Sequence, residues 1–392
     1  MSNPLMSLQK LGQSVWLDDL HRSLITSGEL KRLIEEDGLR GLGSNPSLFE
    51  AAIDDSDEYQ DLLEAPESQA LDSKTLYERI AVRDIQEAAD VFRPVYLESM
   101  RRDGYVSLEV SPRLSRNLQG TLEEARRLWQ AVDRENLMIK IPGTPESFPA
   151  VQELISEGIN VSVTLLFTEQ AYEQAAMAYM SGLERFTLKG GEPGKVASVA
   201  GVFISDIDSA IESLIAERLQ TATYSEERDT LNSLLGKVAC ANAKTIYQKY
   251  MEILSGDRWQ ALSRQGAGPQ RVAWANVGMN NPAYPDVHYI EALIGPGTIS
   301  TMPPGTLASF RDHGQAGPTL TEGLEEARRV MDQLERAGIP FQSLTDQLLA
   351  KGVDEFEDAF AKLLHATNRS RGKPGRDPVV LLRMKLFKAF YR

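Results

Sequence analysis

Eight short apolar segments, separated by stretches with helical periodicity, are the feature that most limits how this 392-residue chain can fold. Such segments are typical of strands buried on both faces, and their alternation with helices predicts parallel βαβ units. Eight units predict an α/β fold of the (β/α)8, TIM-barrel type. An open doubly wound sheet is the alternative, although no G-x-G-x-x-G follows the first segment, which disfavours its dinucleotide-binding form. The predicted strands are Val15–Leu17, Leu39–Gly41, Val106–Val110, Leu137–Ile141, Asn160–Leu165, Ser198–Ile204, Val272–Ala275 and Ile299–Thr301.

Helical patterns fill most of the sequence between these strands. Residues Ser47 to Asp103 are mostly helical in pattern and predict a helical insertion after the second strand, packed against the barrel. The other predicted helices are Leu122–Val132, Phe148–Glu157, Thr168–Ser181, Ile207–Gln220, Glu226–Ser255 and Leu320–Ala337.

The C-terminus changes character at Arg369: from this residue onward, eight Lys or Arg residues accompany one Asp. "NRSRGKPGRDP" has the composition of a linker, and "VVLLRMKLFKAFYR" predicts a basic amphipathic helix. We therefore divide the chain into a barrel, residues 1–368, and a basic extension, residues 369–392. The favoured interpretation is that the extension packs on its own protein or subunit. Contact with an acidic partner or an anionic membrane surface is the alternative.

Composition excludes several classes of protein. The net charge of −14 and the pI of about 5.0 disfavour binding to nucleic acid. A single cysteine, Cys240, fits a reducing compartment, and no HExxH, HxH or CxxC motif predicts a metal site. With no apolar signal core and no long apolar run, the expected location is the cytoplasm.

Lys140 is the most unusual residue of the predicted strands. It lies inside "NLMIKIPGT", between apolar neighbours, where an ammonium is costly unless it is paired or deprotonated. A pKa lowered by burial would supply neutral amine near pH 7, as the nucleophile of a Schiff-base enzyme requires.

Polar residues follow most of the other strands, where a barrel of this type gathers its catalytic groups. Taken singly, each has a structural explanation: Asp18 and Asp206 could cap helices, Asn45 could open a turn, and Glu109 could pair with an arginine. Taken with Lys140, they supply the amine, carboxylates, hydroxyl and amide of a Schiff-base aldolase. The set is Asp18, Asp19, Ser44, Asn45, Glu109, Thr164, Ser205, Asp206 and Asn276.

These residues stand in blocks that resemble the transaldolase family, most closely its longer bacterial form. The blocks include "QSVWLDDL", "GLGSNPSLFEAAI", "GYVSLEVSP", "NLMIKIPGT", "GINVSVTLLFT", "NPAYPDVHYIEALIGPGTISTMP" and "SLTDQLLAKGVDEFEDAFAKLL". The resemblance covers about residues 8 to 366 and leaves out the basic extension.

The resemblance implies a barrel enzyme, without metal or organic cofactor, that moves a dihydroxyacetone unit between sugars. By position, Lys140 matches the Schiff-base lysine and Asp18 the acid/base of C–C cleavage. Glu109 and Thr164 match the pair that holds a catalytic water, and Asn45 matches the amide that orients a substrate hydroxyl.

The sequence departs from the family pattern mainly at the residues that would hold a substrate phosphate. Gly43 stands where the family has threonine, and Gly201 and Asn276 stand where it has serine. Asp206 replaces the phosphate-binding arginine, and Asn280 replaces a lysine. At 6 Å and an effective dielectric near 20, each unit-charge pair is worth about 3 kcal/mol, so Asp206 disfavours a phosphate unless Lys189 or Arg311 compensates.

Three functions follow from this pattern. The first is a transaldolase-like enzyme with an altered substrate preference, acting on a small sugar that need not be phosphorylated. The second is an ordinary pentose-phosphate transaldolase, and the third is a catalytically silent barrel that serves as a scaffold. For the enzyme, the predicted substrate-binding residues are Ser44, Asn45, Asp206, Asn276 and Asn280.

Overall fold

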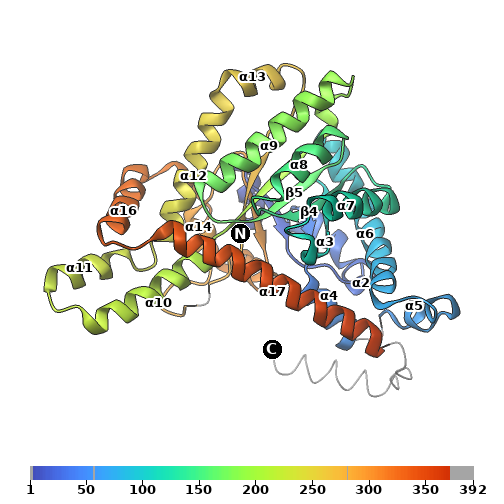
Figure 1. The fold of residues 1–392 in the computed structure, drawn as a ribbon, viewed down its shortest axis with the longest axis horizontal. Helices are drawn as coiled ribbons and strands as arrows, with labels where there is room; N and C mark the ends of the chain where they lie inside the picture. The colour runs from blue at the N-terminus through green and yellow to red at the C-terminus, as the bar shows by residue number, and fades with distance from the viewer. Residues whose placement is uncertain (1–2, 56–57, 280, 371–392) are drawn as a thin grey trace.

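Eight parallel strands, joined in sequence order, close into a barrel in the computed structural model (Figure 1), which describes residues 3–55, 58–279 and 281–370. The predicted (β/α)8 barrel is confirmed, and the open-sheet alternative is wrong because β8 pairs with β1. All eight predicted strands are present, with ends shifted by one or two residues. They are β1 Ser14–Leu17, β2 Leu39–Gly43, β3 Tyr105–Glu109, β4 Leu137–Pro142, β5 Val161–Leu166, β6 Ser198–Phe203, β7 Arg271–Ala275 and β8 Ile299–Met302.

Helices surround the barrel and pack against the apolar side chains on the outer faces of its strands (Figure 1). The α-helices are α1 Pro4–Lys10, α2 Arg22–Thr26, α3 Glu29–Glu36, α4 Pro46–Asp55, α5 Gln60–Glu64, α6 Ser73–Glu98, α7 Leu118–Val132, α8 Phe148–Ser156, α9 Glu169–Leu188, α10 Ser205–Thr221, α11 Ser225–Leu234, α12 Val238–Ser255, α13 Asp257–Ser263, α14 His288–Ala292, α15 Pro304–His313, α16 Leu324–Arg336 and α17 Phe341–Ser370.

One predicted helix is wrong: the pattern from Glu226 to Ser255 forms two helices, α11 and α12. The break lies at Gly236, whose φ of +65° is a left-handed conformation that glycine adopts without strain. Apolar periodicity continues across the break, so the pattern alone gave no sign of it.

The segment between β2 and β3 is helical, as its pattern predicted, and comprises α4, α5 and α6. It also anchors the chain that follows β1. Arg22, at the start of α2, pairs with the buried Asp84 of α6 at 3.2 Å, and Tyr59 donates to the same carboxylate at 2.8 Å. The residues just after β1 are thereby held against the barrel.

The long C-terminal helix α17 crosses one end of the barrel and packs against α4 and α6 (Figure 1). Its approach to β5 is close at Gly352, where a Cβ atom would lie 2.8 Å from the Leu165 side chain. The predicted basic amphipathic helix lies beyond Ser370, outside the described residues. Within the described residues, no helix has the length and apolarity needed to cross a membrane.

Candidate active site

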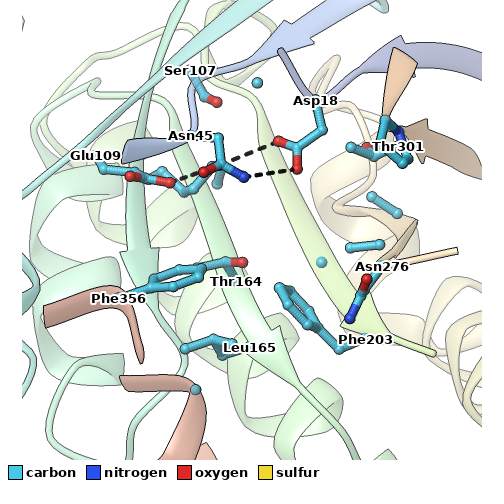
Figure 2. A pocket seen from close by; sticks show the side chains of 18 of the residues that line it. Asp18, Asn45, Ser107, Glu109, Thr164, Leu165, Phe203, Asn276, Thr301 and Phe356 are labelled. Atoms are coloured by element: carbon cyan, nitrogen blue, oxygen red, sulfur yellow. Dashed lines mark hydrogen bonds and ion pairs between the residues drawn. The ribbon is translucent and has the colours of Figure 1, made fainter. Parts of the chain in front are cut away.

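A cavity of about 400 Å³ lies at the C-terminal ends of the strands, with α17 on its other side (Figure 2). Catalytic groups of (β/α)8 enzymes gather at this end of the barrel. Side chains from most strands reach the cavity together with one face of α17. The polar and charged residues that line it are Asp18, Asn45, Ser47, Ser107, Glu109, Lys140, Ser162, Thr164, Asp206, Asn276, Thr301, Lys351 and Glu355.

Lys140 lies on β4 directly beside Glu109 on β3, because the two residues are paired in the parallel register. Its Nζ donates to Glu109 Oε1 at 2.8 Å and to the carbonyl oxygen of Ser44 at 2.7 Å. Asp18 Oδ1 lies 4.0 Å from the same nitrogen. The lysine inside an apolar strand is therefore paired, and its ammonium faces two carboxylates.

The pKa of Lys140 is raised, so the predicted burial-lowered pKa is wrong. Burial is the largest single influence and lowers the pKa, but Glu109 and Asp18 together outweigh it. Burial also raises the pKa of Glu109, in spite of the attraction of Lys140. The resting pair is an ammonium and a carboxylate with an unusually high proton affinity, joined by one hydrogen bond.

Asp18 and Asn45 reach the same end of the cavity from β1 and β2. Asn45 Nδ2 donates to Asp18 Oδ2 at 3.5 Å. Asn45 Oδ1 accepts from the backbone N–H of Ser47 at 3.0 Å, in the first turn of α4. The alternative role of Asp18 as a helix cap is wrong, because His21 caps α2. Asp19 instead faces His21, at 3.7 Å.

Because Gly43 has no side chain, the Asp18 carboxylate can lie directly beside its backbone. A Cβ atom at position 43 would lie 2.9 Å from Asp18 Oδ1 and 3.8 Å from Lys140 Nζ. Any larger residue would therefore displace the carboxylate or be displaced by it.

Thr164 lies on β5, buried and within the cavity wall (Figure 2). The next residue, Leu165, has a φ of +59°, a strained conformation for a non-glycine residue, and the β5–β6 register shifts between Val163 and Leu166. This irregularity places the side chains of both Thr164 and Leu165 in the cavity wall, although strict alternation would separate them. We call Asp18, Asn45, Glu109, Lys140 and Thr164 the lysine end of the cavity.

The other side of the cavity, which we call the far end, contains Asp206, Asn276, Lys351 and Glu355. Asn276 follows β7 with a φ of +49° and donates from Nδ2 to Asp206 Oδ2 at 2.7 Å. Burial raises the pKa of Asp206. Lys351 and Glu355, one turn apart on α17, form an ion pair at 3.4 Å, with side chains 68% and 62% exposed.

Asp206 is not the cap that the sequence allowed. Helix α10 begins at Ser205, its N-cap position is Ile204, and Asp206 lies in the first turn. Its side chain is bound to Asn276 instead, so the residue belongs to the cavity.

Several predicted residues do not reach the cavity. The Ser44 hydroxyl is buried without a hydrogen-bond partner in the described chain, and only its carbonyl contacts Lys140. Lys189 bonds Ser156, and Arg311 pairs with Asp37 at 3.0 Å, so neither supplies the compensating cation. Asn280 lies outside the described residues.

The contribution of α17 was not predicted. Leu348, Lys351, Gly352, Glu355 and Phe356 all line the cavity. The block "SLTDQLLAKGVDEFEDAFAKLL" was a signal that this segment matters, but nothing in a single sequence places a C-terminal helix over strands that precede it by about 200 residues. Among the residues that the structure describes, no three His, Cys, Asp or Glu side chains form a metal-binding group.

Comparison with known proteins supports one assignment over nearly the whole chain. Residues 15–367 match the family described as "Transaldolase/Fructose-6-phosphate aldolase". The chain is 44% identical over 368 residues to a "Transaldolase" of Trichodesmium erythraeum, covering 93% of this chain and 97% of the relative. It is 41% identical over 367 residues to "Transaldolase 2" of a Nostoc species, covering 93% and 96% of the two chains. A "Transaldolase" of Thiobacillus denitrificans is 41% identical over 362 residues, covering 92% and 99%.

The barrel, the buried lysine with two carboxylates beside it, and these similarities lead to the same conclusion. The chain belongs to the transaldolase family, whose members are transferases that use a Schiff-base aldol mechanism.

Proposed function

We propose that this protein transfers a dihydroxyacetone unit between sugars through a Schiff base on Lys140, and that the sugar portion at the far end carries no phosphate. The observation that carries the proposal is the position of Lys140 Nζ, 2.8 Å from Glu109 and 4.0 Å from Asp18 in the cavity. An amine, a proton acceptor and a second carboxylate at one point are the parts that aldol chemistry through an imine requires.

The first step is activation of the amine. Glu109 takes a proton from the Lys140 ammonium across their hydrogen bond. The raised pKa of Glu109 favours this transfer, and the raised pKa of Lys140 opposes it. The neutral amine attacks the ketose carbonyl. Glu109 and Thr164 lie on β3 and β5, the two strands that flank β4. They pass protons to and from the water molecule that is lost when the imine forms and is added again when the imine is hydrolysed.

The second step is cleavage of the C–C bond. The protonated imine draws electrons toward nitrogen, and Asp18 takes the proton of the hydroxyl on the carbon that leaves as an aldehyde. Asn45, already hydrogen-bonded to Asp18, is placed to hold a hydroxyl of the bound three-carbon unit. Reversal of these steps with a second aldehyde completes the transfer.

The far end supports an altered substrate preference. Asp206 and Glu355 are carboxylates, and Lys351 is the one cation there among the described residues. A phosphate dianion beside Asp206 would be repelled by several kcal/mol, at about 3 kcal/mol for each unit-charge pair 6 Å apart in a dielectric near 20.

An ordinary pentose-phosphate transaldolase is the second candidate, and Lys351 is the observation that favours it. If Lys351 left Glu355, its ammonium could contact a phosphate in the same cavity. This arrangement would still leave two carboxylates facing the phosphate, so we rank it second.

Borohydride trapping tests the proposal. The protein is incubated with fructose 6-phosphate, fructose or dihydroxyacetone, reduced, and weighed by mass spectrometry. We expect a stable adduct with the unphosphorylated ketoses that is absent in Lys140→Ala and retained in Lys189→Ala, since Lys189 lies outside the cavity.

Each other outcome identifies a different function. Adducts with fructose 6-phosphate at micromolar levels, together with weak trapping of fructose, would assign the ordinary transaldolase. Failure of every ketose to form an adduct would contradict both enzymatic functions and leave the scaffold.

A further inference from the structure

Each end of the cavity contains two carboxylates and one lysine, but the lysine is held differently at the two ends. At the lysine end, Glu109 and Asp18 face Lys140. At the far end, Asp206 and Glu355 face Lys351 alone among the described residues. Formation of the imine uses the lysine end, whereas nothing in that chemistry uses the carboxylates of the far end.

Asp206 has unused capacity to accept hydrogen bonds. A carboxylate offers about four acceptor positions, and Asn276 Nδ2 is the side-chain donor that the structure shows for this one. Asp206 shares the cavity wall with Phe203, Leu165 and Phe356. The partial burial of Asp206 makes its charged carboxylate costly, and a cation bound beside it would offset that cost.

Lys351 does not neutralise the far end. Its ammonium is bound to Glu355, and both side chains are largely exposed to solvent. One cation between two carboxylates leaves a net charge of −1, and the more buried carboxylate, Asp206, is the one without a direct ion pair among the described residues.

Two residues of the cavity wall, Thr164 and Ser107, carry hydroxyl groups. Thr164 is only 7% exposed and lines the cavity (Figure 2). Its side chain has no hydrogen-bond partner among the described residues. Ser107, 1% exposed, lines it in the same way. Hydroxyl groups in the cavity wall can donate to and accept from a bound polyhydroxyl compound.

We infer that the far end accepts an ammonium group, so that the preferred acceptor is an amino-substituted hydroxyaldehyde, of the amino-sugar class. This inference rests on the proposed function, because it concerns the aldehyde that meets the Lys140-bound three-carbon unit. Asp18 first takes a proton, either from the hydroxyl during cleavage of a donor ketose or from a C–H bond of bound dihydroxyacetone, and this leaves an enamine on Lys140. The enamine carbon bonds to the aldehyde carbon, and the aldehyde oxygen takes the proton back from Asp18. Water then hydrolyses the imine, which releases an amino-ketose and free Lys140. A substrate ammonium brings both a hydrogen-bond donor and a positive charge to Asp206, whereas a hydroxyl brings only the donor and a phosphate brings negative charge.

A competition between three matched acceptors tests the inference. The full chain is supplied at pH 7 with dihydroxyacetone and equal amounts of glyceraldehyde, glyceraldehyde 3-phosphate and 3-amino-2-hydroxypropanal. These acceptors differ only in carrying a hydroxyl, a phosphate or an ammonium at one carbon. The ratio of the ketoses formed, measured by chromatography and mass spectrometry, equals the ratio of the kcat/KM values.

We expect the amino-ketose to exceed the neutral ketose by about tenfold or more, as a partly buried charge-assisted hydrogen bond allows, and the phosphorylated ketose to be the least abundant. Equal or lower yield of the amino-ketose would overturn the inference. So would the absence of all three products if dihydroxyacetone still forms a borohydride-trapped adduct on Lys140, a result that leaves the proposed imine intact. Failure to form that adduct would overturn the proposed function itself.

Two substitutions locate the effect. Asp206→Asn retains the shape and removes the charge, so the ratio of amino-ketose to neutral ketose should fall to about one. Glu355→Gln should lower the ratio less, because its more exposed carboxylate is screened by solvent. Asp229→Asn, which changes an exposed carboxylate on α11, is the matched control and should leave the ratio unchanged. A wild-type ratio in Asp206→Asn would show that the preference arises elsewhere.

Discussion

The lysine end and the far end of one cavity are built from different parts of the fold. The lysine end stands on β1 to β5 and the residues just after them, where a parallel register holds Glu109 beside Lys140. The far end stands on the first turn of α10, the residue after β7, and α17. Strand register fixes the groups of the lysine end together, whereas helices and loops can exchange residues at the far end without disturbing the barrel.

Glu109 and Asp206 show what this difference means chemically. Burial raises the pKa of both carboxyl groups, but Glu109 faces an ammonium of its own protein and Asp206 faces the amide of Asn276. Glu109 therefore has its partner before substrate arrives, and Asp206 gains one only from a ligand. We therefore propose that the lysine end carries out the reaction and the far end selects the substrate, and each prediction below tests this division.

Loss of Lys140 should have the largest effect. Lys140→Ala removes the nucleophile, so turnover should fall by about a thousandfold or more and the borohydride adduct should disappear with every ketose. Mass spectrometry after reduction measures the adduct. An adduct of wild-type yield in Lys140→Ala would place the chemistry on another lysine and break the comparison.

Replacement of Glu109 should come next. Glu109→Gln keeps the shape but cannot take the proton of Lys140, so imine formation should slow by about a hundredfold. The pH profile gives a second readout. Because the pKa of Glu109 lies above its ordinary value of 4.5, its carboxylate form, and with it the rate, is lost as the pH falls through a value higher than 4.5. This acidic limb should be absent in Glu109→Gln, and its survival there would mean that another group accepts the proton.

Gly43→Ala should have an intermediate and selective effect. The added Cβ displaces Asp18, so cleavage of a ketose should slow about ten- to a hundredfold, as small misplacements of catalytic groups do. Adduct formation with dihydroxyacetone, which breaks no C–C bond, should change much less. Gly268→Ala, where a Cβ meets no atom within 4 Å, is the control. Equal losses in both reactions would show that the substitution disturbs more than Asp18.

Lys351→Ala should have the smallest effect. Exposed ion pairs contribute about 0–1 kcal/mol, so the ratio of phosphorylated to unphosphorylated product should change by less than about threefold. Product ratios from mixed acceptors measure it. A loss of more than about thirtyfold in the phosphorylated product would instead identify Lys351 as a phosphate ligand, and the far end as that of an ordinary transaldolase.

Much of the lysine end could be predicted because its residues are polar in or beside segments that are otherwise apolar. Apolar runs give the strands by composition, so Lys140 is conspicuous within its run, and polar residues just after strands fall at one end of any parallel barrel. The register that sets Glu109 beside Lys140 was not predictable at this level. The raised pKa of Lys140 was missed for that reason, since it depends on charges brought by β1 and β3.

The sequence by itself determined the barrel, its eight strands and the candidate reactive groups, because buried strands and buried charges require particular residue types. Tertiary structure alone decided three other matters: the conflict between Gly43 and Asp18, the hydrogen bond from Asn276 to Asp206, and the placement of α17 over the cavity. Each joins residues far apart in the chain, and such contacts depend on barrel closure and helix packing, which no local pattern of residues encodes.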